Sequence, residues 1–355
     1  MKKINCSLFI VLLFVFFSCS TDIEVNAPEE DITVVYAMIN PADSIHYVKI
    51  NKAFIGAESA IDLAANSDNF NYKDSELEVT IEEYSGETWV KAHVLTRTED
   101  EVIKSEGVFD NTGNVLYKFI EPAINESNTY KLKVVNKVLD KVVRAETDIV
   151  NNYKSGGSVR GFTFWTGRQY ATQEISLVVG NNVGRVEAIL NFNYTEHYTT
   201  ASGLPPVDKT ITMSLGEKEA TSSAVTQLLE WEMKGENFYQ KVEDAVALPS
   251  DVPFFSHRLV NDMSIDYKIA GTELSTFMKV AAPSNSVNQD KPAYTNVENG
   301  IGIFSSRTTM IEVPADVSPS FAVNVTSNTI DKLASLGLGF CFGASSTSTF
   351  KCTQL

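Results

Sequence analysis

The fold class is clearest in the segment Tyr130-Lys131-Leu132-Lys133-Val134, which is followed after a polar turn by Val143-Arg144-Ala145-Glu146-Thr147. In both segments apolar and polar residues alternate with a period of two. In an extended strand this pattern places one face in a core and the other in water. The turn around residues 136–141 joins the two segments as a hairpin. The sequence therefore predicts antiparallel sheet in this region.

The same alternation continues outward from the hairpin. Toward the N-terminus it starts at Ile32 and gives seven strand candidates up to Val150, interrupted by one short helix near residues 57–65. That strand number in about 120 residues predicts an immunoglobulin-like β-sandwich over residues 31–150. Tyr130 begins the penultimate strand, as the tyrosine-corner residue of such folds does. A core tyrosine of any β domain is the alternative.

A polar segment at residues 151–158 separates this region from a second one. Residues 159–355 are predicted to form a β-rich domain with a few short helices. Strand alternation recurs in this domain at residues 186–194 and 263–269, and the helical period of 3.6 appears at residues 236–247, 273–280 and 329–336. The expected fold is mainly β, with the immunoglobulin-like sandwich first.

Length and charge narrow the function classes. The 355 residues are enough for about two domains. The chain has 45 Asp and Glu against 29 Lys and Arg, a formal net charge of −16. Nucleic-acid binding rests mainly on basic side chains that neutralise phosphates. We therefore expect no nucleic-acid partner.

The beginning of the chain predicts its compartment. Two lysines precede an apolar run at residues 8–17, and Ser18 precedes Cys19. This is a lipoprotein signal peptide over residues 1–18 with lipidation of Cys19; an ordinary signal with Cys19 as a bystander is the alternative. Residues 19–30 form an acidic tether. We expect a lipid anchor in the outer membrane, with the body facing the cell surface in preference to the periplasm.

Two cysteines remain for the folded body. Cys6 leaves with the signal peptide and Cys19 is the predicted lipidation site, so Cys341 and Cys352 are left in an oxidising compartment. They flank a loop rich in Ser and Thr at residues 343–349. If the flanking residues pair as a hairpin, the two side chains face each other. A disulfide and two free thiols are both open.

No arrangement of residues along the chain names a reaction. The histidines His46, His93, His197 and His257 are scattered, and none lies one helical turn from another or beside a cysteine. A metal site is therefore not expected. The GxSxG motif of α/β-hydrolases, a phosphate loop and a dinucleotide fingerprint are absent. We expect a protein that is not an enzyme and has no cofactor.

One aromatic residue is a candidate ligand contact. Phe162 and Phe164 share a face and are expected in a core, whereas Trp165 falls on the opposite face. An exposed tryptophan offers a flat apolar surface with a polar edge, on which a sugar ring can stack. Trp165 is therefore the candidate residue for glycan binding, and a core position is the alternative.

Two segments resemble a known family. Residues 292–307, which contain Asn299-Gly300-Ile301-Gly302, and residues 35–54 are similar to a domain-of-unknown-function family of Bacteroidetes envelope lipoproteins. The resemblance extends over about residues 30–345. It implies an envelope lipoprotein, often encoded near TonB-dependent transporters, and supplies no catalytic residues. From the residues alone, Asn299 and Gly300 suit a tight turn, and Gly302 permits close backbone approach.

These observations predict an outer-membrane lipoprotein that binds without catalysing and is an accessory to a transport system. Its expected partners are the membrane, through the lipid anchor, and a TonB-dependent transporter or another envelope protein. A surface glycan-binding module is the alternative. Two further hypotheses rank below it. One is a hydrolase, whose catalytic acids or serine would meet only in the folded chain, and the other is an adhesin subunit.

Overall fold

A computed structural model of the chain describes residues 32–53, 67–102, 114–157, 161–180, 182–221, 226–282, 293–313, 324–342 and 352. The signal peptide, Cys19, the acidic tether, the short helix expected at residues 57–65 and the loop at residues 343–349 lie outside these ranges. Over the described residues the chain is mainly β, with several sheets and three α-helices. This confirms the predicted fold class in its coarse form.

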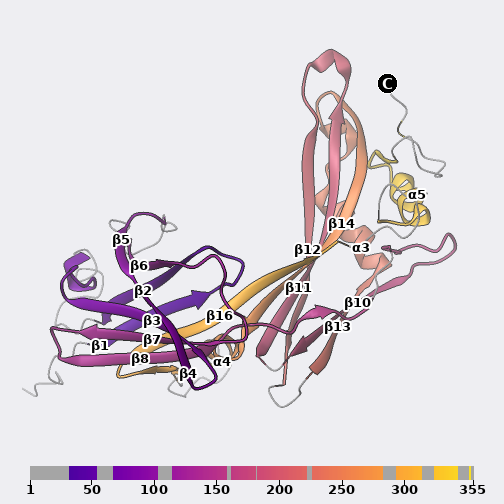
Figure 1. Cartoon of the computed structure of the whole chain (residues 1–355). Helices are drawn as coiled ribbons and strands as arrows, with labels where there is room; N and C mark the ends of the chain where they lie inside the picture. The colour runs from indigo at the N-terminus through magenta and orange to yellow at the C-terminus, as the bar shows by residue number, and fades with distance from the viewer. Residues whose placement is uncertain are drawn as a thin grey trace, which may run out of the picture.

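The N-terminal part forms a lobe of two facing sheets (Figure 1). One sheet has the order β1-β2-β6-β5, and the other β15-β8-β7-β3-β4. Alternate side chains of both sheets form one apolar core, in which Val35, Ile81 and Val134 are fully buried. The strands of this N-terminal lobe are β1 (Ile32–Ile39), β2 (Ile45–Ala53), β3 (Leu77–Ser85), β4 (Thr88–Val94), β5 (Thr96–Glu99), β6 (Val115–Ile120), β7 (Thr129–Asn136), β8 (Lys141–Asp148) and β15 (Val297–Glu298).

The C-terminal lobe also has two sheets around one core. A small sheet, β13-β10-β9, packs on the long strands β12, β11 and β14, which project together from the lobe in Figure 1. The strands are β9 (Lys154–Ser155), β10 (Thr172–Gly180), β11 (Val183–Tyr198), β12 (Val207–Glu219), β13 (Thr226–Lys234), β14 (Phe255–Gly271) and β17 (Phe340–Cys341). The short 3-10 helices of the described chain are Ser67–Asn69, Thr200–Ser202 and Pro249–Asp251.

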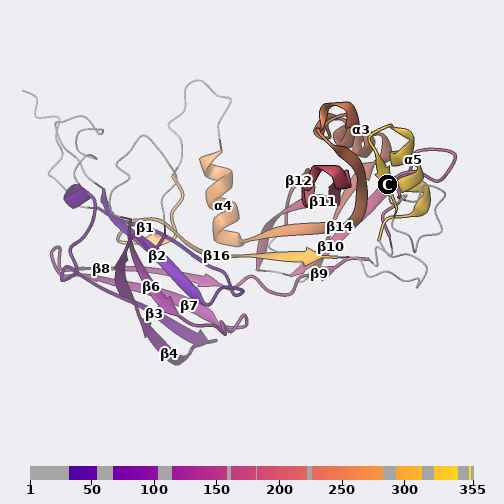
Figure 2. The same cartoon turned by 90° about the horizontal axis from the view of Figure 1, so that it is seen from above.

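The three α-helices occur where the helical period predicts them. They are α3 (Gly235–Ala245), α4 (Thr272–Ala281) and α5 (Ser327–Ser335). The helices α3 and α5 lie in the C-terminal lobe, and α4 stands near the junction of the lobes (Figure 2). No helix within the described residues is long and apolar enough to cross a membrane.

One strand belongs to both lobes. The first half of β16 (Ile301–Glu312) pairs in parallel with β1, and its second half, residues 307–312, pairs antiparallel with β14. A nine-stranded sheet therefore runs through the whole molecule. The division into domains at residues 150–159 stays a prediction. The strand β16, which comes far later in the sequence, pairs with strands on both sides of this division.

Buried serines join the lobes where β16 passes between them. Ser306 is fully buried. Its Oγ donates to the carbonyl oxygen of Asp148 at 2.8 Å and accepts the N–H of Val150 at 2.9 Å. The neighbouring Ser305 Oγ accepts the N–H of Leu274 in α4 at 3.1 Å. These bonds satisfy backbone groups that would otherwise be buried without a partner. Specific hydrogen bonds therefore join the two lobes at this junction.

The glycine motif has the structural role predicted from its residues. Asn299 turns the chain with φ +57°. Gly302 has φ +116°, and a Cβ on it would lie 1.9 Å from the carbonyl oxygen of Val35. Only glycine allows β16 to approach β1 this closely. The segment at residues 151–158 differs from a plain linker, because Lys154 and Ser155 form β9, which pairs with β10 and is the third strand of the small sheet.

Candidate functional site

The two cysteines of the folded body lie together. Cys341 and Cys352 form a disulfide with their Cα atoms 5.1 Å apart. Cys341 ends β17, and the N–H of Cys352 donates to the carbonyl oxygen of Phe342 at 2.8 Å. Their backbones are therefore adjacent as the hairpin argument requires. Cys19, the predicted lipidation site, lies outside the described residues.

Trp165 lies at the edge of the core. Phe162 and Phe164 are fully buried, whereas Trp165 is half-buried. Its ring meets Tyr170 edge-on at 5.1 Å between centroids, and the Lys332 ammonium lies 5.3 Å from its ring centroid. Part of the ring is covered by these neighbours, and its role in glycan binding stays a prediction.

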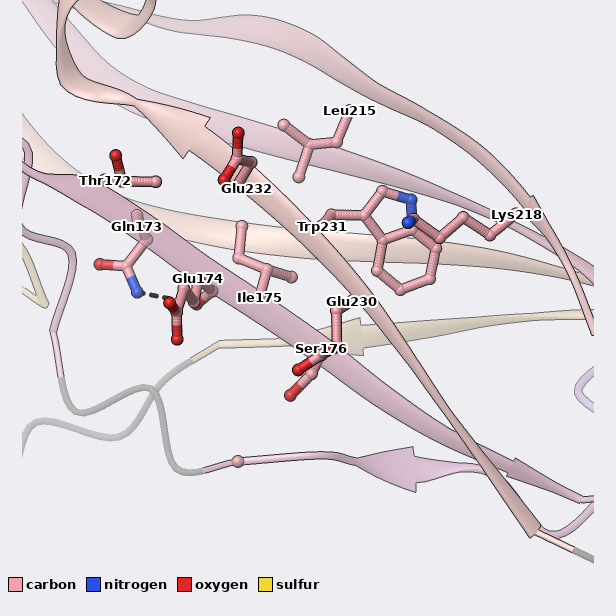
Figure 3. A pocket seen from close by; sticks show the side chains of 11 residues that line it. Thr172, Gln173, Glu174, Ile175, Ser176, Leu215, Lys218, Glu230, Trp231 and Glu232 are labelled. Carbon is pink, nitrogen blue, oxygen red and sulfur yellow. Dashed lines mark hydrogen bonds between the residues drawn. The ribbon is translucent and has the colours of Figure 1, made fainter.

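A groove of about 880 Å³ lies on the C-terminal lobe. The strands β10 and β13 supply most of its lining, and β12 supplies Leu215 and Lys218. Figure 3 shows the side chains of Glu174, Glu230 and Glu232 on the paired strands β10 and β13, together with Trp231 and Lys218. The groove is open to solvent along the surface.

Three carboxylates dominate the charge of this groove. The register of β10 and β13 sets Glu174 directly opposite Glu232, and Glu230 opposite Ser176. All three glutamates are exposed, and none of their carboxylates has a hydrogen bond or an ion pair within the residues described. Like charges directly opposite each other on paired strands are destabilising. The arrangement is therefore costly for the fold and leaves three acceptors free for a ligand.

The groove has a rigid base. Trp231 is 5% exposed, and its Nε1–H donates to the carbonyl oxygen of Gly216 in β12 at 3.0 Å. This bond ties the edge of the small sheet to the edge of the large one, since β13 and β12 are the outer strands. The carboxylates are consequently held on regular strands instead of on a loop, which makes their spacing reproducible.

A second cluster of charges lies at the distal end of the same lobe and is fully paired. Arg258 and Glu196 are each 1% exposed. The guanidinium binds one carboxylate oxygen through Nε at 2.9 Å and Nη2 at 2.7 Å. Lys209 Nζ reaches the other oxygen at 2.7 Å, and Tyr198 donates to it at 3.0 Å. Because this buried ion pair has its hydrogen-bonding groups satisfied, we assign it a structural role.

The N-terminal lobe holds a third titratable cluster. The imidazoles of His46 and His93 lie against the ring of Phe119, 4.7 and 4.9 Å from its centroid. Burial lowers the pKa of His93, with the Lys91 ammonium adding to the effect, so this ring stays neutral near pH 7. Lys91 is bound instead to Glu121. In this cluster the two imidazoles pack against one phenyl ring.

The other two histidines are stacked on each other, and one of them, His257, lies beside the disulfide. His197 of β11 and His257 of β14 are cross-strand neighbours whose rings stack 4.5 Å apart at 8°. Burial, followed by the neighbouring imidazole, lowers the pKa of His257. One ligand atom of His257 and the sulfurs of Cys341 and Cys352 all lie within 4.8 Å of one another. This is the group that could hold a metal ion among the residues described.

Sequence reasoning missed the groove and the His257 neighbourhood for different reasons. The alternation Glu230-Trp231-Glu232-Met233 indicates that both glutamates point outward, so this signal was present in the chain. That Glu174 stands opposite Glu232 depends on strand register, which no local pattern fixes. His257 and Cys341 are brought together by the parallel pairing of β14 with β17.

Comparison with known proteins adds no identity to this geometry. No protein-family model matches the chain, and no curated protein matches it either.

Proposed function

We propose that the protein is a non-enzymatic outer-membrane lipoprotein whose C-terminal lobe binds a basic segment of an envelope partner, as an accessory to a transport system. The observation that carries the proposal is the groove with its three unpaired carboxylates, Glu174, Glu230 and Glu232. A TonB-dependent transporter is the partner that the resemblance to Bacteroidetes envelope lipoproteins implies.

The charges of the groove suit such a partner. Three carboxylates face one lysine, Lys218, within its lining. Lysine and arginine side chains of a partner would form charge-assisted hydrogen bonds with these acceptors and relieve the repulsion between Glu174 and Glu232. Electrostatic complementarity of this kind speeds association and weakens with salt. We expect the complex to be salt-sensitive.

The anchor is the second part of the proposal. Lipidation of Cys19 would hold the body at the outer membrane through buried acyl chains, with the body at the cell surface. Cys19→Ala should move the protein from the membrane fraction into the soluble fraction. Protease added to intact cells should cleave the wild-type body. An unchanged membrane fraction would contradict lipidation, and resistance in intact cells with cleavage after lysis would place the body in the periplasm.

The binding test uses a tagged full chain purified from detergent-solubilised envelopes of the native host. We expect mass spectrometry to find a β-barrel transporter in stoichiometric amount with the wild type. The double variant Glu230→Gln/Glu232→Gln should lose it, because both side chains keep their size and lose their charge. The matched control is Glu236→Gln/Glu243→Gln on the exposed face of α3, which should retain it.

Two results would contradict the proposal. Equal recovery of the transporter by the groove variant and by the control would show that the groove is not the binding surface. Recovery of no envelope protein by the wild type, at low as well as moderate salt, would remove the accessory role.

A glycan-binding module is the second candidate, favoured by one observation. Tyr170 is 41% exposed beside Trp165, so the two rings form an aromatic surface that water reaches. If polysaccharides are retained by the wild type, Trp165→Ala should abolish the retention and Glu230→Gln/Glu232→Gln should not. Retention unchanged in Trp165→Ala would exclude this site.

For the N-terminal lobe we propose the finer prediction of an immunoglobulin-like sandwich. The sheet orders β1-β2-β6-β5 and β8-β7-β3-β4 support it, since they correspond to the two sheets of that fold. Tyr130 supports it as well: its hydroxyl accepts the N–H of Asn125, five residues upstream, at 3.0 Å. This is the bond of a tyrosine corner. Tyr130→Phe should therefore lower the stability of the lobe.

A further inference from the structure

We propose that the distal end of the C-terminal lobe carries a metal site controlled by thiol oxidation: when the Cys341–Cys352 disulfide is reduced, the two thiolates and His257 bind a Zn²⁺ ion. The proposal is independent of the groove, which lies on other strands. It rests on the convergence of three ligand atoms from two separate segments of the chain.

One contact points to a zinc ion, namely a ring nitrogen of His257 near the two disulfide sulfurs. The sulfurs of Cys341 and Cys352 and a ring nitrogen of His257 all lie within 4.8 Å of one another. Tetrahedral zinc, with bonds of about 2.3 Å to sulfur and about 2.0 Å to nitrogen, places neighbouring ligand atoms roughly 3.5–3.8 Å apart. Zinc binding therefore requires the two sulfurs to move apart once the S–S bond is cleaved.

The fold holds these ligands in place. The parallel pairing of β14 with β17 sets Cys341 beside Leu259, and Cys341 Sγ lies 3.5 Å from the carbonyl oxygen of Arg258. The His257 ring is oriented by a 2.9 Å hydrogen bond between its Nδ1 and Ser256 Oγ. Ring-orienting hydrogen bonds of this kind accompany most metal-binding imidazoles. Two of the three ligands are therefore held on strands, and Cys352 is tied to the chain after β17 by the bond from its N–H to the carbonyl oxygen of Phe342.

Access and ligand chemistry agree with the geometry. Cys341 is 8% exposed, whereas His257 and Cys352 are half-buried, so solvent reaches the group from one side. Two thiolates and one imidazole are ligands that Zn²⁺ prefers, and three protein ligands leave a fourth position for water or another ligand. Among the described residues no other group of three His, Cys, Asp or Glu residues converges in this way.

The disulfide state and the metal-bound state exclude each other, because they differ by two electrons on the cysteine sulfurs. A dithiol reductant donates two electrons, which cleave the S–S bond and leave two thiols, while the reductant becomes a disulfide. Zn²⁺ then displaces the two thiol protons and binds both thiolates, with no further redox change. The oxidised pair has no thiolate to offer. Metal occupancy would thus report the redox state around the protein.

The test uses the full chain carrying Cys6→Ser and Cys19→Ser, so that Cys341 and Cys352 are the remaining thiols of the four cysteines. Cobalt(II) is the probe, because thiolate ligation gives a near-ultraviolet charge-transfer band. The oxidised protein should show no band. After reduction and removal of the reductant, the band should appear with one Co²⁺ per chain, and Zn²⁺ should displace it.

Variants separate the site from adventitious thiol binding. His257→Gln keeps both thiols and should weaken Co²⁺ affinity roughly tenfold or more. His93→Gln, an imidazole of the other lobe, is the matched control and should bind as the parent does. Circular dichroism of each variant checks that the sheets remain. Absence of the band in the reduced parent, or equal affinity in His257→Gln and His93→Gln, would overturn the proposal.

Discussion

Glu196 and Glu273 show two ways in which this fold buries a carboxylate. Glu196, at the distal end of the C-terminal lobe, receives bonds from the cations Arg258 and Lys209. Glu273 lies in the first turn of α4 at the lobe junction. Its carboxylate accepts hydroxyl hydrogen bonds, from Ser305 at 3.3 Å and Thr147 at 3.4 Å. Within the described residues no cation is paired with Glu273.

The two surroundings move the pKa in opposite directions. For Glu196, burial raises the pKa, but the bonds from Lys209 and Arg258 outweigh burial and the net pKa lies below the ordinary 4.5. For Glu273, burial raises the pKa above 4.5, and the bond from Ser305 does not cancel the rise. The distal end thus holds a carboxylate that keeps its charge to lower pH, whereas the junction holds an acid that keeps its proton to higher pH.

The largest effect should come from breaking the distal pair. Arg258→Ala leaves the carboxylate of Glu196 buried beside one cation, and we expect the free energy of unfolding to fall by about 3–5 kcal/mol. Urea denaturation followed by tryptophan fluorescence measures it. Arg144→Ala, at an exposed position of β8, is the control and should change stability by less than about 0.5 kcal/mol. Equal effects of the two variants would mean that the pair does not stabilise the lobe.

The junction should be nearly as sensitive, although through the backbone. In Gly302→Ala the new Cβ would meet the carbonyl oxygen of Val35 at 1.9 Å, and the residue would keep a positive φ. Strain and overpacking together should cost roughly 2–4 kcal/mol. Gly86→Ala has positive φ with no atom within 4 Å of the new Cβ, so strain alone, about 1 kcal/mol, is expected. A Gly302→Ala protein as stable as Gly86→Ala would show that β16 and β1 can separate cheaply.

The contrast between the two acids should appear in the pH dependence. Because the folded protein binds the Glu273 proton more tightly than the unfolded chain does, the contribution of Glu273 to stability is present below pH 4.5 and is lost as pH rises through its raised pKa. Glu273→Gln should therefore gain on the wild type as pH rises. The contribution of Glu196 has the opposite sign: it is present above pH 4.5 and is lost as pH falls through the lowered pKa.

Urea denaturation at a series of pH values, applied to the wild type, Glu273→Gln and Glu196→Gln, measures both trends. Stability differences that change in the same direction for the two variants would refute the comparison.

The smallest effect is expected in the groove. Glu232→Gln removes one of two carboxylates that stand directly opposite each other, so stability should change by less than about 0.5 kcal/mol, toward stabilisation. Thermal denaturation beside Glu243→Gln of α3 as the control measures it. A clear loss of stability would mean that this carboxylate serves the fold, and the groove would lose its standing as a binding surface.

Much of the fold was readable from local pattern. The alternation at residues 130–134 and 143–147 lies in the paired strands β7 and β8, and each of the three predicted helices occurs within a few residues of its expected bounds. The strand Thr96–Glu99 was missed, since four residues carry too little alternation. One cause explains both outcomes. Periodicity is a local property, and it can be recognised only in a segment of several residues.

The candidate sites were less readable, because they depend on which segments become neighbours. Two strands, β11 and β12, lie between Glu174 and Glu232 in sequence, and His257 is distant from both Cys341 and Cys352. Pairing of β10 with β13, and of β14 with β17, makes each set adjacent. Packing of the apolar side chains on the core face selects such pairings, and the polar side chains of the outer face are brought together as a result.

Most of the strands, three helices, the acidic excess and the turn at Asn299 can be predicted from local pattern, because side-chain periodicity and backbone preference act over a few residues. No local pattern shows that β16 serves both lobes, that three carboxylates share one groove or that His257 lies beside the disulfide. Those facts follow from long-range strand pairing and core packing, whose energies belong to the assembled sheets and to no single segment.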